Sequence, residues 1–162
     1  MKTALVIGGS RGIGEAIVRK LAGIGWRVGF TYNTGRQQAD IIAAQTGALP
    51  MKADLRSREQ TEEMIADAFT QLGHLDAAVF CAGVSLSGLL QDMSTSEWDE
   101  MFSVNLRGAF LAARPVISRM TGRKEGSLLF VSSVWGLTGA SCEAAYAASK
   151  AGMIGLSNSL AK

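Results

Sequence analysis

The chain has 162 residues, of which 48% are apolar and 19% are charged, and its formal net charge is +2 at pH 7. A chain of this length and composition forms one domain around a single core and is not intrinsically disordered. The small net charge gives no reason to expect a nucleic-acid or membrane partner, and two cysteines with one histidine are too few ligands for a metal site. The short apolar start Ala4-Leu5-Val6-Ile7 lacks the features of a signal peptide, so we expect a cytoplasmic protein.

Short apolar runs alternate with longer amphipathic segments along the whole chain. The expected strands are continuous apolar runs, which is typical of strands covered on both faces, and they span residues 4–7, 27–31, 48–52, 77–80 and 127–132. The expected helices span residues 13–24, 37–46, 58–72, 97–120 and 143–161. This alternation predicts an α/β fold of the Rossmann type, with a doubly wound parallel sheet in a single domain over residues 1–162.

A glycine-rich turn joins the first expected strand to the first expected helix. Glycine permits positive φ angles and a close approach of the backbone to a ligand, while the helix N-terminus offers free N–H groups and a positive dipole end. The spacing, Gly-x-x-x-Gly-x-Gly, differs from the more familiar Gly-x-Gly-x-x-Gly, and a tight turn without a ligand is the alternative. We expect a dinucleotide pyrophosphate to bind at Gly8, Ser10, Arg11, Gly12, Ile13 and Gly14.

The end of the second expected strand favours NADP over NAD. NAD enzymes place an acidic residue there to accept a hydrogen bond from the ribose 2′-hydroxyl, whereas here the first carboxylate is Asp40. A 2′-phosphate meets no repulsion at this position, and Arg11, Asn33, Thr34 and Arg36 are expected to bind it. The alternative for Arg36 is a solvated residue at a helix start.

Further cofactor contacts are expected where the third and fourth strands end, because ligands of such sheets bind at the carboxyl edge. Asp54 and Leu55 follow the third strand, and Ala82 and Gly83 follow the fourth. Asp54 either accepts a hydrogen bond from the adenine amino group or caps the turn that follows it.

The last expected helix carries Tyr146 and Lys150, whose spacing of four residues places them on one face. A lysine ammonium beside a phenol stabilises the phenolate. Ser132 and Ser133 end the fifth expected strand, where a serine hydroxyl can donate to a substrate carbonyl while the tyrosine supplies a proton. A tyrosine–lysine pair alone is usually surface decoration, but its combination with the serines and the glycine turn indicates carbonyl chemistry.

These features together resemble the short-chain dehydrogenase/reductase family, and within it the 3-oxoacyl-[acyl-carrier-protein] reductase branch. The matching segments are residues 7–14, 81–84, 104–106, 131–136 and 145–152. The resemblance implies an NADP(H)-dependent oxidoreductase that reduces a ketone, such as a 3-oxoacyl thioester of fatty acid biosynthesis, to a secondary alcohol. The implied substrate is a small-molecule or acyl-carrier-bound carbonyl compound.

The resemblance also implies roles for four residues. Tyr146 is the general acid in reduction, and Ser133 orients and polarises the carbonyl. Lys150 assists the tyrosine and binds the nicotinamide ribose, so that Tyr146 and Lys150 both lie against the cofactor. Asn105 holds a water in a proton relay, the alternative being a polar residue that only kinks its helix.

The sequence departs from the family pattern at three places. Ile7 stands where a threonine hydroxyl usually ties the glycine turn to the neighbouring strand, and Phe80-Cys81 stands where Asn-Asn is usual. Family members also continue past the helix of Tyr146 with a sixth strand, a substrate-covering segment and a seventh strand. We therefore expect a domain truncated after the helix that follows the fifth strand, with residues 127–131 as an exposed apolar sheet edge.

Two other functions stay open: an NADP-dependent alcohol or sugar dehydrogenase of the same family, and a non-catalytic nucleotide-binding protein if 162 residues is the true length. The resemblance implies a homo-oligomer, a dimer or tetramer, that pairs through the long crossover helix and the tyrosine–lysine helix. On the crossover helix, Met101, Phe102, Phe110 and Leu111 are expected in the core rather than at an interface.

Overall fold

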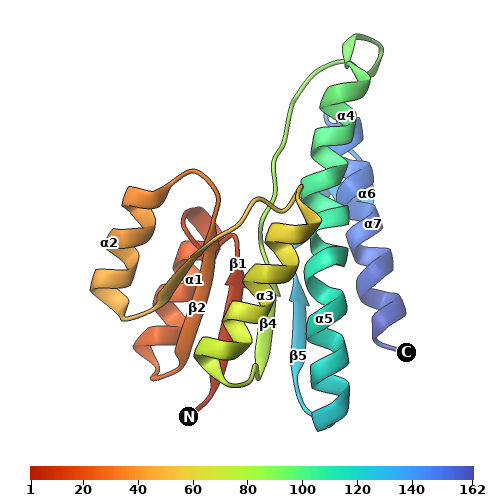
Figure 1. The fold of residues 1–162 in the computed structure, drawn as a ribbon. Coiled ribbons are helices and arrows are strands. Elements are labelled where there is room, and N and C mark those ends of the chain that lie inside the picture. Colours follow the sequence, from red (N-terminus) through yellow and green to blue (C-terminus); the bar gives the residue numbers. More distant parts are fainter.

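The computed structural model describes residues 1–162 and contains one five-stranded sheet with helices on both faces (Figure 1). The strand order is β3-β2-β1-β4-β5, and every neighbouring pair is parallel. This confirms the doubly wound α/β fold, in which the chain reverses its direction of winding between β1 and β4. The strands are β1 (Thr3–Ile7), β2 (Arg27–Tyr32), β3 (Leu49–Lys52), β4 (Ala77–Phe80) and β5 (Ser127–Phe130).

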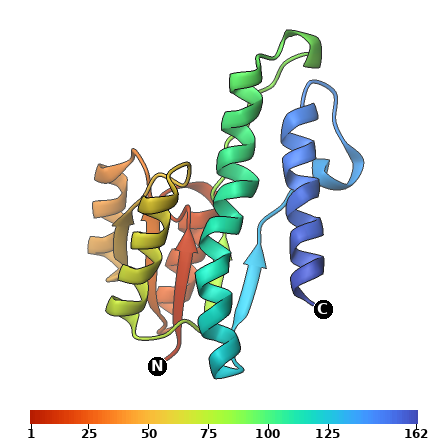
Figure 2. The ribbon, with the colours of Figure 1, turned by 45° about the vertical axis from the view of Figure 1, so that its right-hand side comes forward.

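Helices α1 and α2 cover one face of the sheet, and α3, α5 and α7 cover the other (Figures 1 and 2). No helix is both long enough and apolar enough to cross a membrane. The helical segments are α1 (Gly12–Gly23), α2 (Arg36–Thr46), α3 (Arg58–Leu72), η1 (Leu90–Asp92), α4 (Thr95–Phe102), η2 (Ser103–Arg107), α5 (Gly108–Arg123), α6 (Trp135–Thr138) and α7 (Ala144–Leu160).

Two apolar clusters, one on each face, hold the sheet between its helices. Side chains alternate along a strand, so Leu5 and Ile7 of β1 enter the cluster under α3 and α5, while Val6 enters the cluster under α1 and α2. All five residues of β1 are buried. This burial on both faces explains why the strands read as continuous apolar runs rather than as alternating ones.

The segment expected as one helix over 97–120 is a continuous helical run over residues 95–123 that is interrupted by a π-helical stretch, η2. Asn105 lies in the middle of η2 and is completely buried. Short π-helical stretches inside α-helices occur often at functional sites. Here the stretch turns a polar side chain into the protein interior.

The apolar residues expected in the core of this helical run divide into two groups. Met101 and Leu111 are buried, as expected. Phe110 is 46% exposed on α5, which contradicts the expectation, because it points away from the sheet towards solvent. Phe102 is half-buried and stacks on Trp98 with ring centroids 4.5 Å apart.

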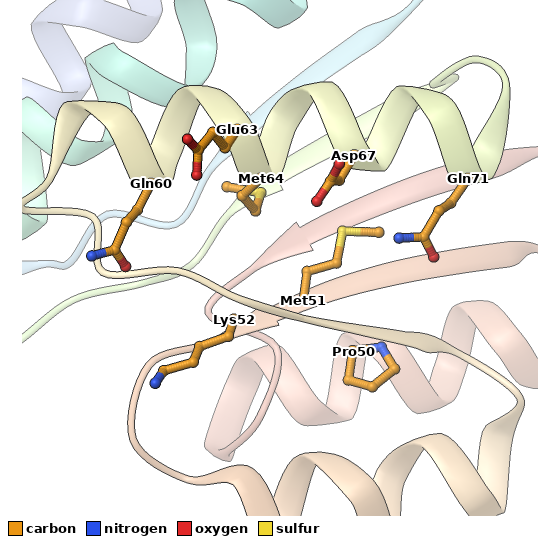
Figure 3. Close-up of a pocket in the computed structure, with 8 residues that line it drawn as sticks. All are labelled: Pro50, Met51, Lys52, Gln60, Glu63, Met64, Asp67 and Gln71. Carbon is orange, nitrogen blue, oxygen red and sulfur yellow. The ribbon is translucent and has the colours of Figure 1, made fainter.

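The edge strands β3 and β5 differ in composition. Strand β3 contains Pro50 and borders a cavity of about 250 Å³ that is lined on the α3 side by Glu63 and Asp67 (Figure 3). Strand β5 contains no charged residue, and its Leu129 is half-exposed. The structure therefore shows the exposed apolar edge that the sequence predicts.

The carboxylate of Asp76, just before β4, joins the amino ends of β4 and β1. Its Oδ2 accepts a hydrogen bond of 2.8 Å from the N–H of Thr3, which holds the pKa of Asp76 below its usual range. A carboxyl with a lowered pKa stabilises the fold above its ordinary pKa of about 3.9, and this stabilisation is lost as the pH falls through the folded value.

We therefore expect Asp76→Ala to lower the free energy of unfolding by about 1–2 kcal/mol near neutral pH, since the Thr3 N–H loses its partner. The difference should shrink as the solution is made acidic. Urea denaturation near pH 7 and near pH 3 measures both effects, with the exposed Asp67→Ala as the control. Equal stability of parent and Asp76→Ala near pH 7 would contradict this role.

Candidate active site

The glycine turn between β1 and α1 is closed on its inner side and open on its outer side. Gly8 and Gly12 have φ angles of 86° and 54°, in the left-handed region that favours glycine. A Cβ on Gly14 would lie 2.0 Å from the oxygen of Gly8, and a Cβ on Gly8 would lie 2.6 Å from the backbone of Ala82. A Cβ on Gly12 would meet nothing within 4 Å. The turn therefore leaves an open cradle at the start of α1, which fits a pyrophosphate.

Thr31 of β2 ties this turn to the neighbouring strand. Its Oγ1 accepts a hydrogen bond of 2.9 Å from the N–H of Gly8, and its carbonyl oxygen accepts one of 3.0 Å from the N–H of Gly9. The sequence suggested that Ile7 leaves the turn without a hydroxyl tie, but a hydroxyl arrives from the adjacent strand while Ile7 packs in the core. The one sign of this tie in the sequence is that Thr31 is a polar residue inside an otherwise apolar strand.

The residues expected to bind a 2′-phosphate surround the end of β2. Arg11 is exposed at the N-cap of α1, and Asn33 and Thr34 are exposed just after β2. Arg36 begins α2 and forms a loose ion pair with Asp40, with an N–O distance of 3.5 Å. The strand ends of β1 and β2 are neighbours in the sheet, so these side chains share one region of the carboxyl edge.

Asp54, expected either to contact adenine or to cap a turn, does cap the turn, and its contact with adenine stays a prediction. Its Oδ1 accepts a hydrogen bond of 3.0 Å from the backbone N–H of Arg56, and its Oδ2 accepts one of 2.6 Å from the guanidinium. The Arg56 side chain holds the pKa of Asp54 below its usual range. The side chain of Leu55 is buried against Gly108, so only its backbone is free to meet a ligand.

The loop after β4 is fixed by Asn105. The amide oxygen of Asn105 accepts a hydrogen bond of 2.8 Å from the N–H of Val84, and its Nδ2 donates to the Val84 oxygen (2.9 Å) and to Ser149 Oγ (3.0 Å). The side chain thus joins the β4 loop, η2 and α7. Because these bonds use both amide hydrogens and the oxygen, the expected water-holding role stays a prediction.

Gly83, in the same loop, lies where Asn105 and Lys150 approach the carboxyl edge. A Cβ on Gly83 would lie 3.3 Å from Asn105 Oδ1 and 3.4 Å from Lys150 Nζ. A side chain at this position would crowd the Asn105 amide and the Lys150 ammonium, which explains why a glycine stands here. Ala82 contributes the backbone against which Gly8 packs.

Tyr146 and Lys150 lie on one face of α7, as their spacing predicts. Lys150 is only 3% exposed, and its Nζ donates a hydrogen bond of 2.8 Å to the oxygen of Val131 and lies 5.7 Å from the centre of the Tyr146 ring. Burial lowers the pKa of Lys150. The ammonium keeps two further N–H donors for a ligand.

The two serines that end the fifth expected strand have different environments. Ser132 Oγ donates a hydrogen bond of 2.9 Å to the backbone oxygen of Lys150 and so fastens α7 to the end of β5. Ser133 Oγ instead accepts a hydrogen bond of 3.2 Å from the N–H of Trp135. The Ser133 hydroxyl donates no hydrogen bond within the structure.

Cys81 occupies one of the positions where the family pattern has asparagine. Its thiol is half-buried between the apolar cluster of α1 and α2 and the Lys150 ammonium. Burial raises the pKa of the Cys81 thiol, so that it stays neutral at physiological pH. An uncharged thiol leaves the positive charge of Lys150 uncompensated at the carboxyl edge.

A cradle at the crossover point of a parallel sheet and a tyrosine–lysine pair beside it place the protein among the dinucleotide-binding α/β oxidoreductases. Residues 2–162 match the model of the short chain dehydrogenase family, and the chain belongs to that family.

Curated relatives extend this comparison along 99% of the chain. A 3-oxoacyl-[acyl-carrier-protein] reductase of Staphylococcus aureus is 34% identical over 166 residues, which cover 68% of that protein. An acetoacetyl-CoA reductase of Shinella zoogloeoides is 36% identical over 161 residues, which cover 67% of that protein. Nodulation protein G of a Rhizobium species is 37% identical over 163 residues, which cover 66% of that protein. The chain thus spans about two thirds of the length of each relative.

The role of Asn105 as a structural tie predicts a large loss of stability on its removal. Asn105→Ala should lower the free energy of unfolding by roughly 3 kcal/mol, because both backbone groups of Val84 then lack partners in a buried site. Ser149→Ala removes only one of the bonds to Asn105 and should lower it by roughly 1 kcal/mol. Urea denaturation of the three proteins tests this order, and equal losses would contradict it.

The hydroxyl of Thr31 predicts a change in ligand binding rather than in stability alone. Thr31→Val keeps the shape of the side chain but removes the acceptor for the Gly8 N–H, so dinucleotide affinity should fall roughly 5-fold. Thr31→Ser keeps the hydroxyl and should bind as the parent does. Fluorescence titration with NADPH measures both variants, and unchanged binding by Thr31→Val would show that the tie does not shape the turn.

Proposed function

We propose that the protein is an NADP(H)-dependent ketone reductase that acts on a small-molecule or carrier-bound carbonyl compound, of the 3-oxoacyl thioester kind. The observation that carries the proposal is the free hydroxyl proton of Ser133 at the same sheet edge as the buried Lys150 and its neighbour Tyr146. The names of two relatives, a 3-oxoacyl-[acyl-carrier-protein] reductase and an acetoacetyl-CoA reductase, support this substrate class.

The open cradle over Gly12 fits a bound dinucleotide. In the proposal, the turn from Gly8 to Gly14 holds the pyrophosphate, and Lys150 and Tyr146 bind the nicotinamide ribose. The 2′-phosphate is bound by Arg11, Asn33, Thr34 and Arg36. The reduced nicotinamide supplies a hydride to the substrate carbon.

The side chains of the protein then act on the substrate oxygen. The Ser133 hydroxyl donates a hydrogen bond to the carbonyl oxygen, which polarises the C=O bond and favours negative charge on the oxygen. Tyr146 transfers its phenolic proton to that oxygen as the carbon receives the hydride, so the ketone becomes a secondary alcohol. The Lys150 ammonium, desolvated by burial, stabilises the phenolate that remains.

The lysine can act in this way because its surroundings fix it. Its Nζ is held by the oxygen of Val131, and its backbone oxygen by Ser132. The neighbouring Ser149 is held by Asn105 and donates a hydrogen bond of 2.8 Å to the oxygen of Tyr146. The helix that carries both reacting residues is therefore fixed at the carboxyl edge at two points.

A homo-oligomer that pairs through α5 and α7 is part of the proposal. The exposed Phe110 on α5 supports it, because a large aromatic ring on a helix surface is a common interface anchor.

The proposed proton donor is tested by Tyr146→Phe. Loss of the phenolic proton should lower kcat for the reduction of acetoacetyl-CoA by NADPH at least about 100-fold, while NADPH affinity should fall far less, because Lys150 and the glycine turn still hold the dinucleotide. Ser141→Ala, an exposed serine before α7, is the control and should retain kcat. The decrease in NADPH absorbance measures turnover, and fluorescence titration measures binding. Normal turnover by Tyr146→Phe, or NADPH binding by the parent without any ketone reduction, would overturn the proposal.

A further inference from the structure

The carboxyl edge of the sheet also carries Lys52, a cation that is not among the cofactor contacts named above. We propose that Lys52, the last residue of β3, binds the 2′-phosphate of NADP(H) together with Arg11 and Arg36, and so determines selection against NAD(H). The inference rests on the NADP preference in the proposed function.

The register of the sheet places Lys52 beside the end of β2. Lys52 pairs with Tyr32, the last residue of β2, and the N–H of Ala53 donates a hydrogen bond of 3.0 Å to the Tyr32 oxygen. Lys52 therefore lies beside the residue that precedes Asn33, and the sequence predicts that the 2′-phosphate binds near Asn33. The sequence pattern gave no sign of this neighbour because the pairing joins residues twenty positions apart.

The side chain of Lys52 lies on the face of the sheet that α1 and α2 cover. Met51 is buried in the cluster under α3, and side chains alternate along a strand, so Lys52 points to the opposite face. Figure 3 shows Met51 directed towards α3 and Lys52 directed away from that helix. Tyr32, its partner in β2, is in the cluster on that opposite face.

Three cations thus converge on the end of β2 from three neighbouring elements. Arg11 stands at the N-cap of α1, in the turn that follows β1, Arg36 stands at the start of α2, and Lys52 stands at the end of β3. Adjacent strands lie about 4.8 Å apart, so the ends of β1 and β3 are only about 10 Å apart with β2 between them. Arginine and lysine side chains are long enough to meet a phosphate over that middle strand.

The charges near the end of β2 favour Lys52 as a phosphate ligand beside Arg11 and Arg36. Arg36 is partly neutralised by Asp40, whereas Lys52 and Arg11 take part in none of the ion pairs of the structure. Lys52 borders the same cavity as Glu63 and Asp67 of α3, but in Figure 3 its side chain extends away from these two carboxylates. A phosphate monoester carries close to two negative charges at neutral pH, so an unpaired ammonium attracts it strongly.

The test compares binding of NADPH and NADH to the parent and to Lys52→Ala by fluorescence titration. NADPH affinity should fall about 10-fold, the usual effect of losing one charge-assisted contact, while NADH affinity stays the same. Lys52→Arg should keep the preference for NADPH. Lys20→Ala removes the same charge at the far end of α1, where the side chain is exposed, and should change neither affinity.

A second probe isolates the phosphate. Adenosine 2′,5′-bisphosphate should displace NADPH from the parent better than adenosine 5′-monophosphate does, and Lys52→Ala should reduce this advantage. A preference for NADPH that survives intact in Lys52→Ala overturns the assignment of Lys52 alone, as does an equal fall in the affinities for both dinucleotides. Equal affinities of the parent for NADPH and NADH overturn the proposed NADP preference and the assignment of Lys52 with it.

Discussion

The buried amide of Asn105 is the interaction on which the arrangement of the site depends. It joins three segments that are far apart in the sequence: the loop after β4, the crossover helix and α7. A buried amide is stable only when its donors and acceptor are satisfied, and here each of them has a protein partner. At its far end the β4 loop is also bonded to the start of the tyrosine–lysine helix, by Gly88 N–H to the Cys142 oxygen and by Ser87 to Glu143, so Asn105 provides the buried one of these ties. The π-helical stretch is what turns that side chain inward from a helix that otherwise packs on the sheet.

The hydrogen bonds of Asn105 also help to position the residues at the carboxyl edge of the sheet. The fixed α7 places Lys150 against the end of β5, where the oxygen of Val131 holds its ammonium and where Ser133 begins the next turn. The parallel sheet brings the glycine cradle to the same edge, because the carboxyl ends of all five strands point in one direction. The proposed nucleotide site and the proposed proton-transfer site are therefore neighbours because of topology, and hydrogen bonds to backbone atoms position the residues of each.

Much of this arrangement is predictable from the sequence because it rests on local patterns. Continuous apolar runs identify all five strands to within two residues at each end, and the glycine turn follows β1 as expected. Tyr146 and Lys150 are found by their spacing. The π-helical stretch was not predictable, since a change in backbone hydrogen-bond register leaves no apolar period to recognise. Pairings between distant residues were also missed, among them Thr31 with the glycine turn.

Partners close in sequence can mislead as well. For Asp54 the sequence left two roles open, and only the structure shows that Arg56, two residues later, bonds to its carboxylate, while a contact with adenine stays a prediction. Phe110 was expected in the core together with the other apolar residues of this helical run, yet its ring is exposed on α5.

The two edge strands of the sheet differ in how well their backbones can pair with a further strand. Alternate residues of a parallel strand bond to the same neighbour, and Ala53 bonds to β2, so the backbone nitrogens of Pro50 and Lys52 face outwards. Proline has no hydrogen to donate, which leaves this edge a poor template for another strand. The β5 edge has neither proline nor charge to obstruct pairing. The backbone of β5 is therefore a better template for a further strand than the backbone of β3.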